Sequence, residues 1–239
     1  MTSRTSGGLM EIVRTIVYAI LIAFVVRTFA FEPFNIPSGS MKPTLLVGDY
    51  LFVTKWTYGY SRYSFLWGWP AFSGRIGAAP VTRGDVVVFK VPSDNETDYI
   101  KRIVGLPGDR IQVIGGILHI NGEPVKREPI DDWVDSDGQS FTQYDETLPN
   151  GVIHHIVEAS DRAPLDDTDE FLVPPGNYFG MGDNRDNSQD SRVFGFIPEE
   201  NLVGRASFIF YSTTGAGRWW EVWNWLPRTR LGRLFSGIT

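Results

Sequence analysis

Hydrophobic residues follow two different patterns along this chain. Residues 15–26 read TIVYAILIAFVV and carry no charge. With the residues that follow, they form a mostly apolar stretch of about 17–20 residues, the shortest that spans a bilayer as a helix. Beyond Pro33, helical periodicity is almost absent, and short β-type runs alternate with turn signals. The pattern therefore predicts one N-terminal helix followed by a β region.

Basic residues indicate how this helix is oriented. Arg4 and Arg14 precede its uncharged part, which by the positive-inside rule places the short N-terminus, residues 1–10, in the cytoplasm. A cleaved secretory signal has a similar basic start and apolar core, but the sequence FEPFNIP that follows offers no small-x-small cleavage site. We therefore expect a retained transmembrane helix at residues 11–31, with the core helix of a soluble protein as the remaining alternative.

The β region contains six clear strand patterns, separated by Gly-Asp, Pro-Gly and Asn-Gly turns. They lie at residues 50–54, 85–90, 99–104, 109–114, 117–120 and 206–211. Strands this short and closely spaced predict a mainly β fold, with an antiparallel sandwich or barrel-like core. We expect this core to comprise residues 32–120 and 171–215.

Three segments differ from this pattern. Residues 121–170 are acidic with weaker strand signals, and we interpret them as an inserted β subdomain. Residues 57–80 are aromatic and Gly-rich, typical of a loop packed on the core or of a surface at a membrane interface. The tail, residues 216–239, is rich in tryptophan and arginine and lacks a long apolar core, which favours an interfacial segment over a second span. The tail includes Trp219, Trp220, Trp223 and Trp225.

Composition narrows the function classes. The net charge of −6 argues against nucleic acid as a partner, which requires a basic face. The chain has no cysteine, which excludes disulfides, a thiol nucleophile and thiolate metal sites. Its 3 histidines are too few and poorly spaced for zinc, so we expect no metal and no cofactor.

The first polar cluster with chemical potential lies shortly after the helix, in IPSGSMKPTL at residues 36–45. Pro37 and Pro43 stiffen this segment, and Gly39 permits backbone geometry that other residues resist. Such a segment could hold the Ser40 hydroxyl in place beside backbone N–H groups, as a nucleophile requires. Taken alone, however, such a run is most often a simple turn.

A serine nucleophile needs a base, and Lys101 is a better candidate than the histidines. Alternation along residues 99–104 places Lys101 on one strand face between Tyr99 and Ile103. A lysine buried among apolar groups loses its proton readily, because burial can lower its pKa by several units. An exposed strand lysine is the other interpretation. His119, His154 and His155 fit surface or core-edge positions, since none lies in a motif with a carboxylate.

The third cluster, GDNRDNSQDSR at residues 182–192, lies between apolar flanks. A polar run of this kind is often a solvated loop. Its alternating aspartates and arginines instead suggest a partly buried hydrogen-bonded network. The twelve-residue calcium loop with its closing glutamate is absent.

Together these clusters give the sequence a close resemblance to bacterial type I signal peptidases, the Ser/Lys leader peptidases. The resemblance covers nearly the whole chain, and the motifs occur in the same order. They are FEPFNIPSGSM at 31–41, GDY at 48–50, RGDVVVF at 83–89, YIKRIVGLPGD at 99–109 and GDNRDNSQDSR at 182–192. The chain is similar to one-anchor members, and it lacks the cysteines that some members carry in the insert.

The resemblance implies a role for each polar position. Ser40 would be the nucleophile, Lys101 the general base, and Ser38 would form the oxyanion hole with the Ser40 N–H. Ser188 would orient the lysine. The implied supporting network consists of Asp183, Arg185, Asp190 and Arg192. The implied apolar walls of the P1 and P3 pockets are Phe34, Ile36, Pro37, Met41, Leu45, Tyr99 and Ile100. The family core is an antiparallel β fold with an inserted β subdomain.

The implied function is that of a membrane-bound serine endopeptidase that removes signal peptides from exported preproteins after small residues of the Ala-x-Ala type. Its partners would be preprotein signal peptides and the lipid bilayer, with no nucleic acid, and we expect a monomer. The location would be the bacterial inner membrane, single-pass, with the catalytic region on the periplasmic side. Nine residues separate Phe31 from Ser40, which therefore lies within about 30 Å of the bilayer.

Three other classes deserve comparison. A tethered binding module without activity is disfavoured, because every polar position that the chemistry requires is filled. A cytoplasmic Ser/Lys self-cleaving regulator would carry a DNA-binding domain in place of the helix. A Ser/His hydrolase would need a histidine in a motif with a carboxylate.

Overall fold

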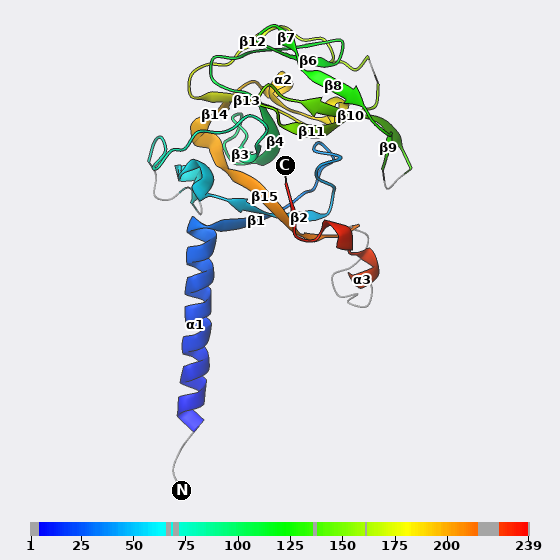
Figure 1. Cartoon of the computed structure of the whole chain (residues 1–239). Helices are drawn as coiled ribbons and strands as arrows, with labels where there is room; N and C mark the ends of the chain where they lie inside the picture. Colours follow the sequence, from blue (N-terminus) through cyan, green and yellow to red (C-terminus); the bar gives the residue numbers. More distant parts are fainter. Residues whose placement is uncertain are drawn as a thin grey trace.

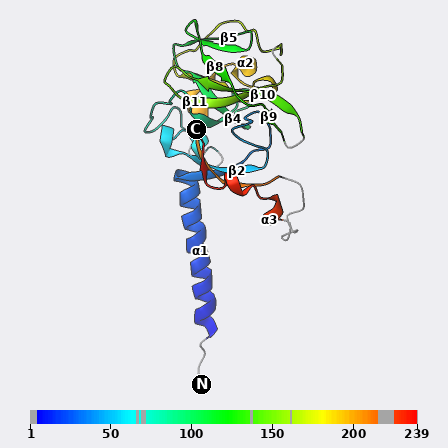
Figure 2. The ribbon, with the colours of Figure 1, turned by 45° about the vertical axis from the view of Figure 1, so that its right-hand side comes forward.

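The N-terminal apolar segment forms helix α1 (Thr5–Phe29), which projects from the β region as a separate rod (Figures 1 and 2). Its residues Met10–Phe29 have a mean hydropathy of 2.0, and almost none of them is buried. At about 1.5 Å per residue these 20 residues cover about 30 Å, the thickness of a hydrocarbon layer. The helix begins at Thr5, before the predicted residue 11, and ends at Phe29, two residues before the predicted residue 31. It ends there because Phe31 already belongs to a strand.

This computed structural model describes residues 5–65, 68, 72–135, 138–160, 162–214 and 225–238. Most of the β region is one antiparallel eight-stranded sheet in the order β1-β2-β15-β3-β4-β13-β14, with β16 also paired to β15. These strands are β1 Phe31–Asn35, β2 Asp49–Thr54, β3 Val86–Lys90, β4 Asp98–Gly105, β13 Asn177–Met181, β14 Ile197–Pro198, β15 Leu202–Ser212 and β16 Ser236–Gly237. All six predicted strand patterns are strands in the structure, and the predicted mainly β antiparallel class is confirmed.

The long strand β15 lets this sheet curl. Its first residues pair with β3, while its later residues pair with β2 on one side and β16 on the other. Register shifts interrupt the pairing at three places along it, and each such bulge adds local twist and bending. The sheet therefore closes around a core instead of lying flat.

Two smaller sheets lie at the end of the β region that is farthest from α1 (Figures 1 and 2). One has the order β12-β5-β6-β7, and the other has the order β11-β10-β8 with β9 also paired to β10. Their strands are β5 Arg110–Ile114, β6 Ile117–Ile120, β7 Glu123–Pro124, β8 Lys126–Pro129, β9 Trp133–Val134, β10 Ser140–Thr147, β11 Ile153–Glu158 and β12 Phe171–Leu172. The expected core extends to residue 120, with the insert beginning at residue 121. In the structure, β5 and β6 precede residue 121 but pair outside the large sheet.

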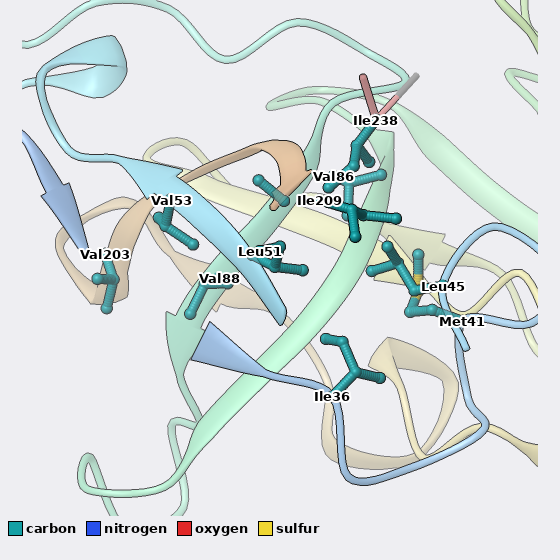
Figure 3. Close-up of a cluster of buried hydrophobic side chains, with 11 residues drawn as sticks. Ile36, Met41, Leu45, Leu51, Val53, Val86, Val88, Val203, Ile209 and Ile238 are labelled. Atoms are coloured by element: carbon teal, nitrogen blue, oxygen red, sulfur yellow. The ribbon is translucent and has the colours of Figure 1, made fainter. Parts of the chain in front are cut away.

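A buried apolar cluster fills the curl of the large sheet (Figure 3). Met41, Leu45, Leu51 and Val53 are fully buried in it. The cluster also contains Ile36, Val86, Val88, Val203, Ala206, Ile209 and Ile238. The segment that follows β1 is therefore anchored in the core by its own apolar side chains.

The C-terminal residues belong partly to this core. Ile238 is 6% exposed, and β16 pairs with β15. Arg233 donates to the Thr44 carbonyl at 2.8 Å and to Asp49 Oδ2 at 2.5 Å. The expected interfacial tail is thus, over its last residues, an integral part of the fold. Trp219, Trp220 and Trp223 and the side chain of Trp225 lie outside the described residues.

Short helical turns complete the described chain. They are η1 Trp56–Tyr58, η2 Arg62–Ser64, η4 Arg185–Asn187, α2 Ser191–Phe194, η5 Glu199–Asn201, α3 Trp225–Arg228 and η7 Leu231–Arg233. The segment with η1 and η2 packs on the core through Tyr58, which is 1% exposed. It also holds the end of α1, because the Tyr60 hydroxyl donates to the Phe29 carbonyl at 2.6 Å and Phe65 contacts the Phe29 ring. The helix is therefore attached to the β region at a defined place.

Truncation of Leu51 tests this core. We expect Leu51→Ala to lower the free energy of unfolding by about 2–5 kcal/mol, because it removes fully buried methyl groups and leaves a cavity. The measurement is urea unfolding of the full chain in detergent micelles, followed by tryptophan fluorescence. Leu172→Ala is the matched control, since Leu172 is 63% exposed, and should change stability by less than about 1 kcal/mol. Equal losses in the two variants would contradict this description of the core.

Candidate active site

The segment from β1 to β2 positions Ser40. The Ile36 N–H donates to the Asp49 carbonyl at 2.8 Å, and the Gly48 N–H donates to the Ile36 carbonyl at 3.0 Å, which closes the segment into a loop. Within the loop, the Leu45 N–H donates to the Met41 carbonyl at 2.8 Å, forming one helical turn. This turn directs Met41 and Leu45 together into the core. Ser40 therefore belongs to a segment that is anchored by packed side chains.

Gly39 contributes space and not an unusual backbone angle. It is absent from the glycines with positive φ, so the predicted special backbone geometry is not what requires a glycine here. A Cβ at this position would lie 2.9 Å from Lys42 Cε, too close for an unstrained contact. The missing side chain therefore lets the Lys42 side chain cross the loop and form an ion pair with Asp135 near β9.

Strand β4 brings Lys101 to Ser40. Lys101 Nζ lies 2.9 Å from Ser40 Oγ and also donates to the Ile100 carbonyl at 2.8 Å. The residue is 3% exposed, and its Nζ is 5.5 Å from the centre of the Tyr99 ring. Ser38 Oγ lies 3.4 Å from Ser40 Oγ. The predicted base, nucleophile and neighbouring hydroxyl therefore meet at one point, although 61 residues separate Lys101 from Ser40.

Burial lowers the pKa of Lys101 from 10.5 to about 8. The carboxylates of Asp190 and Asp183 oppose this shift, and Arg192 adds to it. An unperturbed lysine is almost entirely protonated at neutral pH. With a pKa of about 8, roughly a tenth of the amine is neutral at pH 7, so it is available as a proton acceptor.

The loop of residues 182–192 holds the nucleophile segment by its backbone. The Asn184 N–H donates to the Ser40 carbonyl at 3.1 Å, and the Asn184 side-chain amide donates to the Gly39 carbonyl at 3.1 Å. This loop follows β13, which pairs with β4 next to Lys101. Asn184 thus ties the Ser40 segment to the loop that follows the neighbour strand of β4. Nothing in the residue pattern singles out Asn184 beyond its membership of the polar cluster.

Gly182 is the tightest contact of the site. A Cβ here would lie 2.2 Å from Ser188 Oγ and 2.5 Å from the Ser40 carbonyl oxygen. Ser188 is 6% exposed and borders the same groove as Ser40 and Lys101. Its hydroxyl contributes to lowering the pKa of Asp190. Among the described residues, the structure shows no hydrogen bond from Ser188 to Lys101, so the orienting role implied for Ser188 stays a prediction.

Two arginine–aspartate pairs surround the lysine. Arg102 is fully buried and binds Asp183 through two bonds of 2.8 Å. Arg192 binds Asp190 at 2.9 Å, and the Asp190 carboxylate also accepts from the Gly182 N–H at 3.0 Å. Burial acts to raise the pKa of each aspartate, but the paired arginine outweighs it, so both carboxyls stay ionised. Of these residues, Arg102 was not predicted.

A further buried group connects this loop with β10 and β11. Arg185 binds Glu146 of β10 through both carboxylate oxygens, the longer bond measuring 3.0 Å. His154 of β11 lies 3.3 Å from Glu146 and 4.0 Å from Asp183, and burial lowers its pKa. Arg185 was expected in the network, whereas Glu146 and His154 were missed. The sheet that contains β10 and β11 therefore contacts the loop of residues 182–192 directly.

A groove of about 910 Å³ leads to Ser40. Five of the predicted substrate-pocket residues line it, namely Phe34, Ile36, Pro37, Tyr99 and Ile100. Met41 and Leu45 are fully buried, because the helical turn directs them into the core, and their place in the substrate pockets stays a prediction. The opposite wall includes Leu165, Gln189 and Val193, which were not predicted.

The three histidines contact groups other than Ser40. His119 contacts the Ile117 carbonyl at 2.9 Å, and His155 contacts Asp145 at 2.6 Å on the surface. His154 is more deeply buried than predicted and contacts carboxylates of the supporting network. An open apolar groove that ends at a serine hydroxyl paired with an amine is the arrangement of a serine protease.

Comparison with known proteins narrows this class. The sequence profile of the family described as signal peptidase, peptidase S26, matches residues 9–211. Signal peptidase I of Rickettsia typhi is 39% identical, with 99% of this chain and 96% of that protein covered. Signal peptidase I of Rickettsia conorii is 42% identical over 92% of this chain and 90% of that protein. The chain therefore belongs to the signal peptidase family, peptidase S26, a family of serine proteases.

Among solved structures, a signal peptidase I from Enterococcus faecalis V583 is 25% identical to this chain. That comparison has a TM-score of 0.34 and covers 54% of this chain and 98% of the other.

Gly182→Ala tests the close contact at the centre of the site. The added Cβ must displace the Ser40 backbone or Ser188, so we expect the cleavage rate to fall at least about 100-fold, as small misplacements of reacting groups do. The measurement is turnover of a signal-peptide substrate beside the thermal unfolding midpoint. Gly232→Ala is the control, because a Cβ there meets nothing within 4 Å, and it should retain the parent rate. A fully active Gly182→Ala enzyme would refute the geometry described for this site.

Proposed function

We propose that this protein is a membrane-bound endopeptidase that uses Ser40 as nucleophile and Lys101 as general base to cleave signal peptides from preproteins. The observation that carries the proposal is the 2.9 Å contact between Lys101 Nζ and Ser40 Oγ, formed by an amine that is almost completely buried. Burial favours the neutral amine, and only the neutral amine can accept a proton.

The reaction follows from this geometry. Neutral Lys101 accepts the Ser40 hydroxyl proton while Ser40 Oγ attacks the carbonyl carbon of the scissile peptide bond. The Ser38 hydroxyl, 3.4 Å from Ser40 Oγ, and the Ser40 N–H stabilise the oxygen that becomes negative. The Lys101 ammonium then gives its proton to the departing amine of the mature protein. A water molecule deprotonated by Lys101 hydrolyses the acyl-enzyme and releases the signal peptide with a free carboxylate.

The groove supports a preference for small residues at P1 and P3. Beside Ser40 the groove is lined by Ile36, Pro37 and Ile100, and Ile36 packs in the same core cluster as Met41 and Leu45. Strand β1 forms an edge of the large sheet, so an extended peptide can pair along it. Side chains of an extended peptide alternate in direction, and P1 and P3 therefore point to the same wall. Ala-x-Ala sequences fit this arrangement.

The outer face of β2 and β15 supports contact with a bilayer. A continuous row of aromatic rings crosses it, with Phe52 lying 5.8 Å from Phe31 and 4.4 Å from Phe210. Trp56, which is 48% exposed, lies 4.8 Å from Phe31. Aromatic residues of this kind prefer the membrane–water interface, and Phe31 follows α1 almost directly. With the N-terminus in the cytoplasm, the β region lies on the periplasmic side of a bacterial inner membrane.

The test of this function is direct cleavage. The full chain in detergent is incubated with a preprotein whose signal peptide ends in Ala-x-Ala, and the products are identified by mass. We expect one cut after the final alanine, and a rate at least about 1,000-fold lower for Ser40→Ala. A cut elsewhere, or equal rates in the two enzymes, would refute the proposal.

The pKa of Lys101 predicts the pH dependence of cleavage. Because the neutral amine is the active form, kcat/KM should rise about tenfold per pH unit below the pKa and level off above about pH 8. The measurement is kcat/KM from pH 5 to pH 10. Lys101→Arg should be as inactive as Lys101→Ala, because an arginine keeps its proton in any surroundings. Appreciable activity in the arginine variant would exclude a neutral base.

Lys101→Met separates this catalytic role from a structural one. The pKa of Lys101 is about 8 in the folded chain and about 10.4 when unfolded, so the unfolded chain binds more protons between these values. Parent stability therefore rises with pH through this window, and at pH 7 the parent carries the full cost of a buried ammonium. We expect the inactive Lys101→Met to be more stable by about 2–3 kcal/mol at pH 7, with the difference shrinking towards pH 10.

A further inference from the structure

A second cavity of about 700 Å³ lies beside the groove, between the last turns of α1 and the β region. Phe24 and Thr28 line it from the helix, and Phe65 lines it from the segment with η1 and η2. Phe34 and Asp98 line both this cavity and the groove that leads to Ser40. The two spaces therefore share a border, and a chain leaving the groove past Phe34 enters this cavity.

Charged groups on the rim of this cavity neutralise one another. Lys55 is 3% exposed and binds Glu32 at 2.7 Å and the Ser64 carbonyl at 2.6 Å. Lys90 binds Asp98 at 2.9 Å and the Glu96 carbonyl at 2.7 Å. In all, the described lining carries four cations and four anions, namely Arg27, Lys55, Arg62 and Lys90 with Glu32, Asp94, Glu96 and Asp98. Such a rim offers little attraction to an ion, but it is compatible with an uncharged polar chain.

The helix side of the cavity lies within the apolar part of α1. Phe24 precedes the last helical residue, Phe29, by five positions, or about 7 Å along the axis. Phe24 and Thr28 are one turn apart and share a helix face, so the cavity extends along the helix towards the hydrocarbon layer. A segment that passes from water into the membrane would fit along this face.

We propose that this cavity binds the signal peptide upstream of its cleavage site, where the uncharged extended residues join the apolar helix. The inference rests on the function proposed above. Between Phe34 and Phe31, β1 advances three residues, or about 10 Å, towards the end of α1. A substrate running beside it needs about three to five residues beyond the one at Phe34 to reach Thr28. The enzyme therefore recognises the end of the apolar segment as well as the small residues next to the cut.

Site-specific photocross-linking locates the occupant. Benzoylphenylalanine replaces Thr28 in the Ser40→Ala chain, reconstituted in phospholipid vesicles with a full-length preprotein. We expect a cross-link to signal-peptide residues upstream of P5. The matched control replaces Val26, which does not line the cavity and is turned by about 200° from both Phe24 and Thr28 on the same helix. Cross-links to lipid alone at position 28, or equal cross-links at positions 26 and 28, would overturn the proposal.

A kinetic comparison gives a second measurement. Thr28→Trp obstructs the helix side of the cavity, so the ratio of kcat/KM for the full-length preprotein to kcat/KM for a short cleavage-site peptide should fall about tenfold. Val26→Trp should leave this ratio unchanged, and an equal effect of the two substitutions would contradict the inference. Cleavage by the parent chain distinguishes a failure of this inference from a failure of the proposed function. If the parent cleaves the preprotein but the ratio does not change in Thr28→Trp, only this inference fails; if the parent does not cleave, the proposed function fails with it.

Discussion

The candidate active site depends on the burial of one amino group, that of Lys101. Removing Lys101 from water is costly for its charged form, and neighbouring carboxylates could easily have restored the charge. They oppose the lowering of its pKa only in part, because Asp183 is bound through both oxygens to Arg102, and Asp190 is bound to Arg192 and the Gly182 N–H. The arginines thus keep two necessary carboxylates engaged, while the pKa of Lys101 stays well below that of a free lysine. The buried ion pairs around the site maintain reactivity more than they add stability.

Much of this fold was predictable, because local pattern determines it. The apolar run of α1 and the alternating residues of β2, β3 and β4 identify themselves from neighbours in sequence, and the order of the motifs identified Ser40 and Lys101. Positions that depend on distant partners were not predictable. Glu146 and His154 look like ordinary strand residues until β10 and β11 are placed against the 182–192 loop. The depth of Met41 and Leu45 likewise depends on a turn that only the folded core reveals.

The attachment of α1 gives the site a fixed level above the membrane. The Tyr60 hydroxyl and the Phe65 ring hold Phe29 at the helix end, and β1 continues from there as an edge strand. The nucleophile is therefore connected to the bilayer through paired backbone and not through a flexible linker. On the function proposed above, a substrate anchored in the same bilayer would meet Ser40 at one height, which would restrict cleavage to bonds close to the membrane surface.

The contacts of the C-terminal residues bear on the timing of synthesis. Ile238 packs in the cluster that contains Met41, and Arg233 holds the Thr44 carbonyl in the loop after Ser40. A nascent chain that has reached only residue 212 already contains Ser40, Lys101 and the whole 182–192 loop, but it lacks these two supports. The packing that supports the Ser40 segment is complete only when the ribosome has added residues about 20 positions further on. The fold of the Ser40 segment therefore depends on residues that are synthesised after every group of the candidate active site.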